Sequence, residues 1–187
     1  MESITVVGAS LAGLRAAETL RREAFEGRIT ILGDEPRRPY DRPPLSKQIL
    51  SGAWEPDRAP LLSDDAFDAL DLDWRLGERA SGLDLGARRL LLEDGSSVDY
   101  DGLVIATGCR CITLPETEEL AGVHTLRTLD DCLAIRADLE ASPSRVVVVG
   151  AGFIGAEVAA TAKELGLDVT VVEMAAVPFE RILGAAM

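Results

Sequence analysis

Residues 145–173 read RVVVVGAGFIGAEVAATAKELGLDVTVVE. The apolar run at 145–150 predicts a short buried strand, and the stretch 153–165 predicts a helix that ends at Gly166. The run at 168–173 predicts a second strand. Strand, glycine turn, helix and strand in this order form a βαβ unit, whose two strands lie parallel in one sheet. This stretch therefore indicates an α/β fold.

The loop after the first of these strands, GAGFIG, matches the G-x-G-x-x-G fingerprint of dinucleotide-binding units. Gly150 permits the tight turn, Gly152 lets the backbone approach a pyrophosphate, and Gly155 permits close helix packing. Glu173 ends the next strand 18 residues after Gly155, where a carboxylate accepts both ribose hydroxyls and repels a 2′-phosphate. The pattern predicts NAD(H) binding, with a tight helix–sheet junction as the alternative. The candidate contacts are Gly150, Ala151, Gly152, Phe153, Ile154, Gly155 and Glu173.

The same order opens the chain, with predicted strands at 3–8 and 28–33 and a helix at 14–24. Its loop, GASLAG, departs from the fingerprint at Ser10, a residue small enough for a pyrophosphate to approach. Two carboxylates follow the second strand, 21 and 22 residues after the last glycine of the loop. The candidate contacts are Gly8, Ala9, Ser10, Leu11, Ala12, Gly13, Asp34 and Glu35. Two such sites in one chain are best explained by a tightly held flavin and a diffusing nicotinamide cofactor.

The segment between the two units predicts shorter elements. A short helix is expected at 64–70 and a buried strand at 103–108. The runs DWRL, ASGLDL and RRLLLEDGSSVDY predict a small antiparallel β layer with a turn at Asp94-Gly95. A further strand is expected at 123–127, ahead of a helix at about 129–140.

The composition argues against nucleic-acid-binding, membrane-spanning and disulfide-rich classes of protein. The 187 residues carry a net charge of −13, which argues against general affinity for nucleic acid or an anionic membrane. Because no apolar run approaches the roughly 20 residues of a membrane span and the N-terminus lacks signal-peptide order, we expect a cytoplasmic protein. The three cysteines, Cys109, Cys111 and Cys132, have no C-x-x-C spacing, so neither a disulfide framework nor a metal site is expected. Cys109 and Cys111 are expected to be small filler beside a turn, with a ligand or redox pair as the alternative.

The stretch RPYDRPPLSKQIL at 38–50 carries three prolines and a lysine, which fit neither a helix interior nor a central strand. Together with VVGASLAGLRAAE, ITILGDE, YDGLVIATG, LRTLDD and VVVVGAGFIGAEVA, it resembles the FAD-dependent, NADH-linked ferredoxin reductases. These belong to the pyridine nucleotide-disulfide oxidoreductase superfamily. The similar blocks occur in the family's order along essentially the whole chain.

The resemblance implies roles for residues outside the two glycine loops. Arg42 and Lys47 would contact the flavin from the proline-rich loop, and Glu157 would face the nicotinamide and pair with Lys47. Without the resemblance, Lys47 would be an exposed lysine of a solvated loop and Glu157 a surface helix charge. The remaining residues that the resemblance places near a cofactor are Ala80 and Arg127, beside FAD, and Arg181, on the adenosine side of NAD.

The resemblance also implies a domain division. We expect the first part of an FAD-binding domain at 1–113, a connecting strand and helix at 114–143, and the start of an NAD-binding domain at 144–187. A doubly wound nucleotide domain needs several more strands than this last range supplies. We therefore expect the chain to be the N-terminal portion of a longer polypeptide.

The implied activity is hydride transfer from NADH to FAD, followed by single-electron transfer to a ferredoxin-type iron–sulfur protein. Residues 38–50 contain no cysteine, so electrons are expected to leave the flavin without a dithiol relay. Arg37, Arg38 and Arg42 are candidates for a local docking patch, and His124 is expected to be structural. Alternatives are an NAD(H)-sensing flavoprotein of the apoptosis-inducing-factor type, a reductase of rubredoxin, quinone or a small molecule, or an inactive fragment. The oligomeric state is left open.

Overall fold

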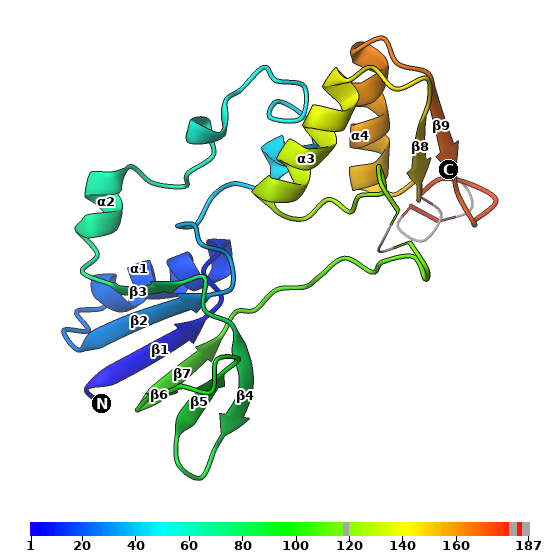
Figure 1. The fold of residues 1–187 in the computed structure, drawn as a ribbon. Helices are drawn as coiled ribbons and strands as arrows, with labels where there is room; N and C mark the ends of the chain where they lie inside the picture. Colours follow the sequence, from blue (N-terminus) through cyan, green and yellow to red (C-terminus); the bar gives the residue numbers. More distant parts are fainter. Residues whose placement is uncertain (118–119, 180–182, 185–187) are drawn as a thin grey trace. The chain divides into compact units, whose positions relative to one another are not determined.

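A computed structural model describes residues 1–117, 120–179 and 183–184. These residues form two compact units, and Figure 1 labels their helices and strands. The first unit comprises residues 1–41 and 60–109. The second comprises residues 42–59 and the described residues from 110 onward. Each unit contains one of the two βαβ arrangements that the sequence predicts.

The first unit is built on a parallel sheet of four strands in the order β3-β2-β1-β7. The strands are β1 (Ser3–Val7), β2 (Arg28–Gly33), β3 (Asp73–Leu76) and β7 (Gly102–Ile105), and helix α1 (Leu11–Arg22) connects β1 to β2. The predicted strands at 3–8 and 28–33 are confirmed, and α1 begins three residues before the helix that the sequence predicts.

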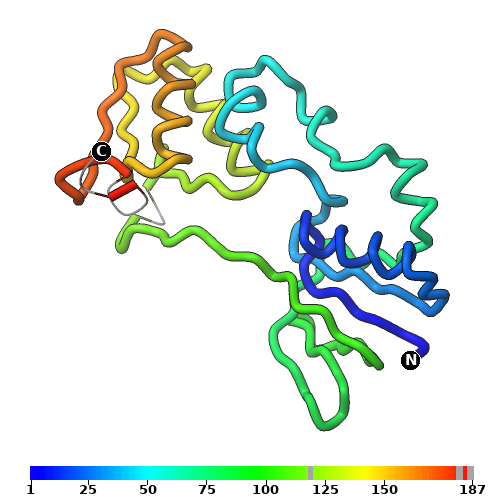
Figure 2. The backbone as a smooth tube through the Cα atoms, turned by 180° about the vertical axis from the view of Figure 1, so that it is seen from behind, coloured from blue at the N-terminus to red at the C-terminus, as the bar shows by residue number. Residues whose placement is uncertain are grey.

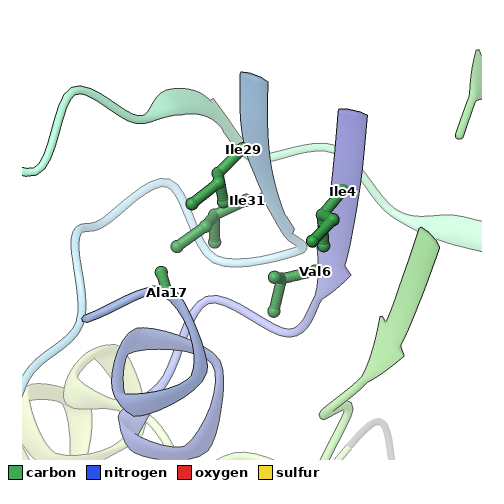
Figure 3. Close-up of a cluster of buried hydrophobic side chains, with 5 residues drawn as sticks. All are labelled: Ile4, Val6, Ala17, Ile29 and Ile31. Atoms are coloured by element: carbon green, nitrogen blue, oxygen red, sulfur yellow. The ribbon is translucent and has the colours of Figure 1, made fainter. Parts of the chain in front are cut away.

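The core of this unit follows from the alternation of side chains along β1 and β2. Figure 3 shows Ile4, Val6, Ile29 and Ile31 meeting Ala17 of α1 on one face of the sheet. The other face carries Val7 and Leu32, which pack with leucines of the antiparallel layer. Because both faces are covered, β1 and β2 are almost continuously apolar, as strands of a parallel sheet are.

The small antiparallel layer is present as β4 (Ala80–Asp84), β5 (Arg89–Leu92) and β6 (Ser97–Asp99). Gly95 has φ +85° in the turn between β5 and β6, at the predicted position. DWRL was expected in this layer, and that expectation is wrong, because the run forms β3 and pairs with β2 in the parallel sheet. Trp74 of β3 packs edge-on against Phe67 at 5.7 Å, which anchors the strand beside α2 (Asp64–Asp68).

Strand β7 differs from the prediction at 103–108 in length and burial. It ends at Ile105, whose side chain is 68% exposed. It stands at one end of the sheet order and is hydrogen-bonded to β1 alone among the described strands. An edge strand of this kind is less buried than the central strands, which explains the difference.

The second unit contains the other βαβ arrangement. Strands β8 (Val146–Val149) and β9 (Val169–Val172) are parallel, and α4 (Phe153–Glu164) connects them. Gly166, at φ +84°, donates its N–H to the carbonyl of Lys163 and ends the helix as predicted. Helix α3 (Leu129–Glu140) has the predicted bounds, because a reciprocal capping box between Thr128 and Asp131 fixes its start.

Residues 42–59, which we call the strap, contain two short 3₁₀ helices, η1 (Pro43–Ser46) and η2 (Pro56–Arg58). Figure 2 lets the chain be followed from β2 into the strap, which packs on α3 and α4. The strap therefore belongs by its packing to the second unit, although its sequence interrupts the first.

The strand expected at 123–127 is absent from the described part of the chain. Side chains make hydrogen bonds to backbone groups of this segment that would otherwise bond to a neighbouring strand. The N–H of Arg127 donates to the Asp131 carboxylate, and its carbonyl accepts from the Arg42 guanidinium. The carbonyl of Leu126 accepts from the Cys111 thiol. These three backbone groups are therefore satisfied without a neighbouring strand.

Candidate functional site

The first glycine loop follows β1. Gly8 has φ +120°, and a Cβ added there would lie 2.0 Å from the carbonyl oxygen of Ala106. A Cβ on Gly13 would lie 2.0 Å from the carbonyl oxygen of Gly8. Both positions therefore require glycine, because no side chain fits. Ser10 is the N-cap of α1, with extended backbone, so the loop leads directly into the positive end of the helix.

The two predicted ribose-binding acids lie where β2 ends. Asp34 is exposed and Glu35 is half-buried. The hydroxyl of Tyr40, a buried residue, donates to the Glu35 carboxylate. A Cβ on Gly33 would lie 2.5 Å from the Cβ of Ala9, so the end of β2 touches the glycine loop. The structure thus brings the acids and the first loop to the same edge of the sheet.

The second loop repeats this geometry. A Cβ on Gly155 would lie 2.0 Å from the carbonyl oxygen of Gly150, as for Gly13 and Gly8, and Gly150 has φ +103°. Gly150 and Gly152 differ from Gly155, since none of the described residues beyond the adjoining ones has an atom within 4 Å of a Cβ added at either position. The middle glycine is therefore not required by packing within the described residues. It leaves space on the loop into which a ligand can approach the backbone.

Glu173, the predicted ribose-binding acid of the second unit, contacts the loop directly. One carboxylate oxygen accepts the N–H of Ala151 at 2.7 Å. The other accepts the N–H groups of Met174 and Ala175 at 2.8 and 2.9 Å. These backbone donors hold the carboxylate beside the glycine loop, at the position that the sequence predicts for a ribose contact.

The predicted pair of Lys47 and Glu157 is present. The Lys47 ammonium donates to Oε2 of Glu157 at 2.8 Å, and both side chains are a little over one-third exposed. Lys47 follows η1 in the strap, and Glu157 lies in the second turn of α4. The two residues are 110 positions apart in the sequence, so packing of the strap on α4 brings them together.

The hydrogen bond from Lys47, and after it that from Ser46, lowers the pKa of the Glu157 carboxyl below its ordinary value of 4.5. The folded state therefore favours the charged form. By linkage, the associated stability is present above pH 4.5 and is lost as the pH falls through the lower pKa of the folded state. At neutral pH the pair is an ammonium–carboxylate contact.

Arg42 and Arg127 also lie together in the second unit. The guanidinium of Arg42 donates to the carbonyl of Arg127 at 2.5 Å. The N–H of Arg127 donates to Asp131, whose carboxylate also accepts the N–H of Thr128 at the start of α3. The strap is therefore fastened at its first residue to the segment that leads into α3. Ala80, the other residue expected beside FAD, begins β4 and packs against the core around Val7. Arg181 lies outside the described residues.

Arg38, one of the candidates for the docking patch, has partners within the first unit. Arg38 pairs with the carboxylates of Asp64 and Asp68, at 3.4 and 2.7 Å. Its guanidinium also lies over the rings of Phe67 and Trp74, at 5.4 and 5.9 Å from their centroids. Arg38 thus fastens α2, and two carboxylates offset its charge.

Other chemistry-bearing residues have structural surroundings. All three cysteines are free thiols within the described part of the chain, and burial raises the pKa of the Cys132 thiol to about 11. His124 contacts the Asp138 carboxylate of α3 at 2.7 Å through Nε2. Residues 1–117, 120–179 and 183–184 contain no cluster of three potential metal ligands. In the same ranges, no helix is long and apolar enough to cross a bilayer.

Two residues of the site were missed by the sequence argument. Ser46 donates to Glu157 Oε2 at 2.5 Å, and Thr161 donates to the carbonyl of Ser46 at 2.8 Å. Ser46 stands next to Lys47 in the proline block, and Thr161 stands four residues after Glu157, on the same helix face. The positions of both residues beside the predicted pair are visible in the sequence. Their contacts depend on the packing of the strap on α4, which the sequence pattern does not show.

The fold and these loops define an α/β protein with two Rossmann-like dinucleotide-binding units and a small antiparallel layer. The chain belongs to the pyridine nucleotide-disulphide oxidoreductase family, whose model matches residues 2–187.

Relatives within this family are reductase components. The chain is 42% identical over 185 residues to the biphenyl dioxygenase system ferredoxin–NAD(+) reductase component of Paraburkholderia xenovorans (strain LB400), covering 98% of this chain and 45% of that protein. It is 44% identical over 188 residues to rhodocoxin reductase of Rhodococcus erythropolis, covering 99% and 43%. The chain thus spans less than half the length of these curated relatives.

Two solved structures of reductases resemble this chain in fold and sequence. The putidaredoxin reductase–putidaredoxin covalent complex matches with a TM-score of 0.90 and 37% identity, covering 97% of this chain and 44% of that chain. The ferredoxin reductase for the CYP199A2 system from Rhodopseudomonas palustris matches with a TM-score of 0.90 and 36% identity, covering 100% and 46%.

Proposed function

We propose that this chain is the nucleotide-binding portion of an NADH-dependent, FAD-containing reductase that delivers single electrons to a ferredoxin-type iron–sulfur protein. The observation that carries the proposal is the repeated glycine-loop geometry at Gly8–Gly13 and Gly150–Gly155. The names of the relatives, ferredoxin–NAD(+) reductase component and putidaredoxin reductase, support the same activity.

The first loop fits the pyrophosphate of FAD. The loop leads into the positive end of α1, and its middle residue, Ser10, is small enough for a pyrophosphate to approach. Asp34 or Glu35 would hold the ribose at the edge of the same sheet. Arg42, Lys47, Ala80 and Arg127 remain proposed FAD contacts on the strength of the family resemblance.

The second loop fits the pyrophosphate of NADH. The open space at Gly152 admits the ligand to the backbone, and the first turn of α4 would supply N–H groups of Phe153 and Ile154. Glu173, held beside the loop by backbone donors, would accept the ribose hydroxyls and repel a 2′-phosphate. NADH is therefore preferred over NADPH in this proposal.

When bound, the two cofactors supply hydride transfer from NADH and one-electron transfer from FAD. The role of the chain is orientation and electrostatics. Lys47 would present a positive charge that stabilises negative charge developing on the flavin. Glu157 holds the Lys47 ammonium in place and stays ionised at neutral pH.

The strap contains no cysteine, so the chain offers no thiol there to relay electrons. In this proposal the electrons pass directly to the iron–sulfur partner. The chain is acidic, with a net charge of −13, so an acidic ferredoxin would require a local basic patch on this protein. Arg37, Arg38 and Arg42 are the proposed candidates for this patch, and Arg38 also makes ion pairs within the first unit.

Two further assignments belong to the proposal. The domain division keeps residues 1–113 as the first part of the FAD-binding domain, 114–143 as the connection and 144–187 as the start of the NAD-binding domain. The location is cytoplasmic, where NADH is available to the second loop.

The test is the visible spectrum of the purified chain after incubation with FAD, before and after NADH is added under nitrogen. The expected result is a bound-flavin spectrum that NADH bleaches and that a ferredoxin restores. NADPH should bleach it more slowly. Failure of the chain to retain FAD, repeated on a polypeptide of the relatives' full length, would refute the proposal. Restoration by quinone but not by ferredoxin would refute the proposed acceptor alone.

A further inference from the structure

The carboxylate of Glu157 receives two donors on one oxygen. Both the Lys47 ammonium and the Ser46 hydroxyl reach Oε2, at 2.8 and 2.5 Å. Lys47 Nζ also lies 3.5 Å from the Ser46 oxygen, so the three groups close a triangle. The Ser46 hydroxyl has one proton to donate, and the charged carboxylate is nearer than the Pro43 carbonyl at 3.3 Å. The hydroxyl therefore donates to Glu157.

A second contact fixes the same serine from the other side. The Thr161 hydroxyl donates to the carbonyl oxygen of Ser46 at 2.8 Å, in a buried position. Ser46 is 4% exposed and Thr161 is 5% exposed, in contrast to the partly exposed Lys47 and Glu157. Glu157 and Thr161 are one turn apart on α4, so one face of the helix holds both the hydroxyl and the carbonyl of Ser46.

These contacts make the pair different from an ordinary surface ion pair. A lysine–glutamate pair with both partners more than one-third exposed contributes little, because two long side chains must be held in one geometry. Here a buried serine orients the carboxylate, and a buried threonine holds the serine backbone. The rotamer entropy that limits a surface pair is reduced by contacts outside the pair itself.

We propose that Ser46 and Thr161 are positioning residues, which act as a two-point clamp to fix the Glu157–Lys47 pair in the geometry that the reductase uses. The inference rests on the proposed function, because it assigns the pair a part in hydride transfer. It adds two residues that touch neither cofactor in the proposal and that act through Glu157 and through the strap backbone.

The test compares four variants of the full chain. Ser46→Ala removes the hydroxyl that reaches Glu157 and retains the backbone carbonyl. Thr161→Val removes the other hydroxyl at nearly constant shape, and Thr161→Ser restores it. Ser51→Ala is the matched control, because the Ser51 hydroxyl lies in the same strap. Among the described residues it bonds only within the strap, to the Gln48 carbonyl and the Ala53 N–H.

Two readouts are measured on each variant. The first is the pKa of the Glu157 side-chain carboxyl, from its carbon-13 chemical shift as a function of pH without cofactors. The second is the rate at which NADH bleaches bound FAD in an anaerobic stopped-flow experiment. Ser46→Ala should raise the pKa of Glu157 and slow bleaching about tenfold. Thr161→Val should slow bleaching similarly, whereas Thr161→Ser and Ser51→Ala should match the unmodified chain.

Each outcome decides a separate point. An unchanged pKa of Glu157 in Ser46→Ala would overturn the clamp, whatever the activity. A raised pKa with an unchanged rate of bleaching would overturn the positioning role. If NADH bleaches neither the unmodified chain nor a polypeptide of the relatives' full length, but the pKa of Glu157 rises in Ser46→Ala, the clamp is supported and the proposed function fails instead.

Discussion

Different positions within the glycine loops meet different constraints. The last glycine of each loop is required by the chain itself, because its missing side chain leaves room for the carbonyl of the first glycine. The middle position is different, since Ser10 stands there in the first loop and Gly152 lies in open space in the second. At the residue scale, the last glycine is therefore required for packing, whereas the middle position leaves room for a ligand, and substitutions at the two positions should have different effects.

Gly155→Ala and Gly152→Ala should therefore fail in different ways. The added methyl at Gly155 meets a backbone oxygen at 2.0 Å and should lower the free energy of unfolding by about 1–3 kcal/mol. At Gly152 the methyl meets none of the described residues within 4 Å, so stability should hold while NADH binding weakens about tenfold. Urea unfolding and NADH titration of the two variants check both statements. Equal loss of stability in both variants would contradict this reading of the loop.

Glu173→Gln should relax the choice between NADH and NADPH. Glutamine retains one oxygen for the backbone N–H groups that Glu173 accepts, but it removes the charge that repels a 2′-phosphate. The ratio of kcat/KM for NADPH to that for NADH should rise about tenfold. Steady-state rates with each cofactor measure it, and an unchanged ratio would show that Glu173 does not select the cofactor.

Short elements of this protein depend on contacts from elsewhere in the chain. Helix α2 is only five residues long, too short to be stable on local hydrogen bonds. The hydroxyl of Ser63, its N-cap residue, accepts the N–H of Ala66. Arg38 stabilises the helix further through two ion pairs and contacts to two aromatic rings. The strap shows the same dependence, since its Ser46 and Lys47 are held by α4.

Arg38→Ala should therefore destabilise the first unit by about 1 kcal/mol, through lost cation–π contact and lost ion pairs. Arg38→Lys, which keeps the charge but not the planar guanidinium, should recover only part of the loss. Thermal unfolding followed by near-ultraviolet circular dichroism measures both variants. If Arg38→Ala keeps full stability but slows reduction of a ferredoxin, the residue belongs to the docking patch after all.

At the scale of the whole molecule, two compact units each carry their own glycine loop, acid and parallel strands. Neither unit is one continuous stretch of chain, because the strap is inserted in the sequence of the first unit and packs with the second. Two loops with one geometry and two separate units predict two nucleotide sites that can be lost independently.

Gly13→Ala and Gly152→Ala test this independence. A methyl at Gly13 meets the Gly8 carbonyl at 2.0 Å, so this variant should retain less than about a tenth of the FAD bound by the unmodified chain. Gly152→Ala should retain FAD in full and lose NADH affinity. The ratio of flavin to protein and the NADH titration are measured on the same preparations. Loss of FAD from Gly152→Ala would show that the sites are not separate.

Local sequence was enough for most of the fold. The apolar runs of β1, β2, β8 and β9 and the glycine spacing between them specify both βαβ units, because each pattern lies within about thirty consecutive residues. Helix α3 was predicted with its bounds because Thr128 and Asp131 cap it from within its own first turn. The Lys47–Glu157 contact was expected as well, but from the family resemblance and not from any local pattern.

The tertiary structure decided everything that needs a distant partner. DWRL forms a parallel strand because it pairs with the edge of β2. Residues 123–127 form no strand within the described residues, and side chains of Arg42, Cys111 and Asp131 hydrogen-bond to backbone groups of this segment. Ser46 and Thr161 come into contact only because the strap packs on α4, across 115 positions of sequence. The periodicity of apolar residues and the residue types of turns are local properties of the sequence. The pairing of strand edges and the hydrogen bonds of buried hydroxyls depend on which distant surfaces folding brings together.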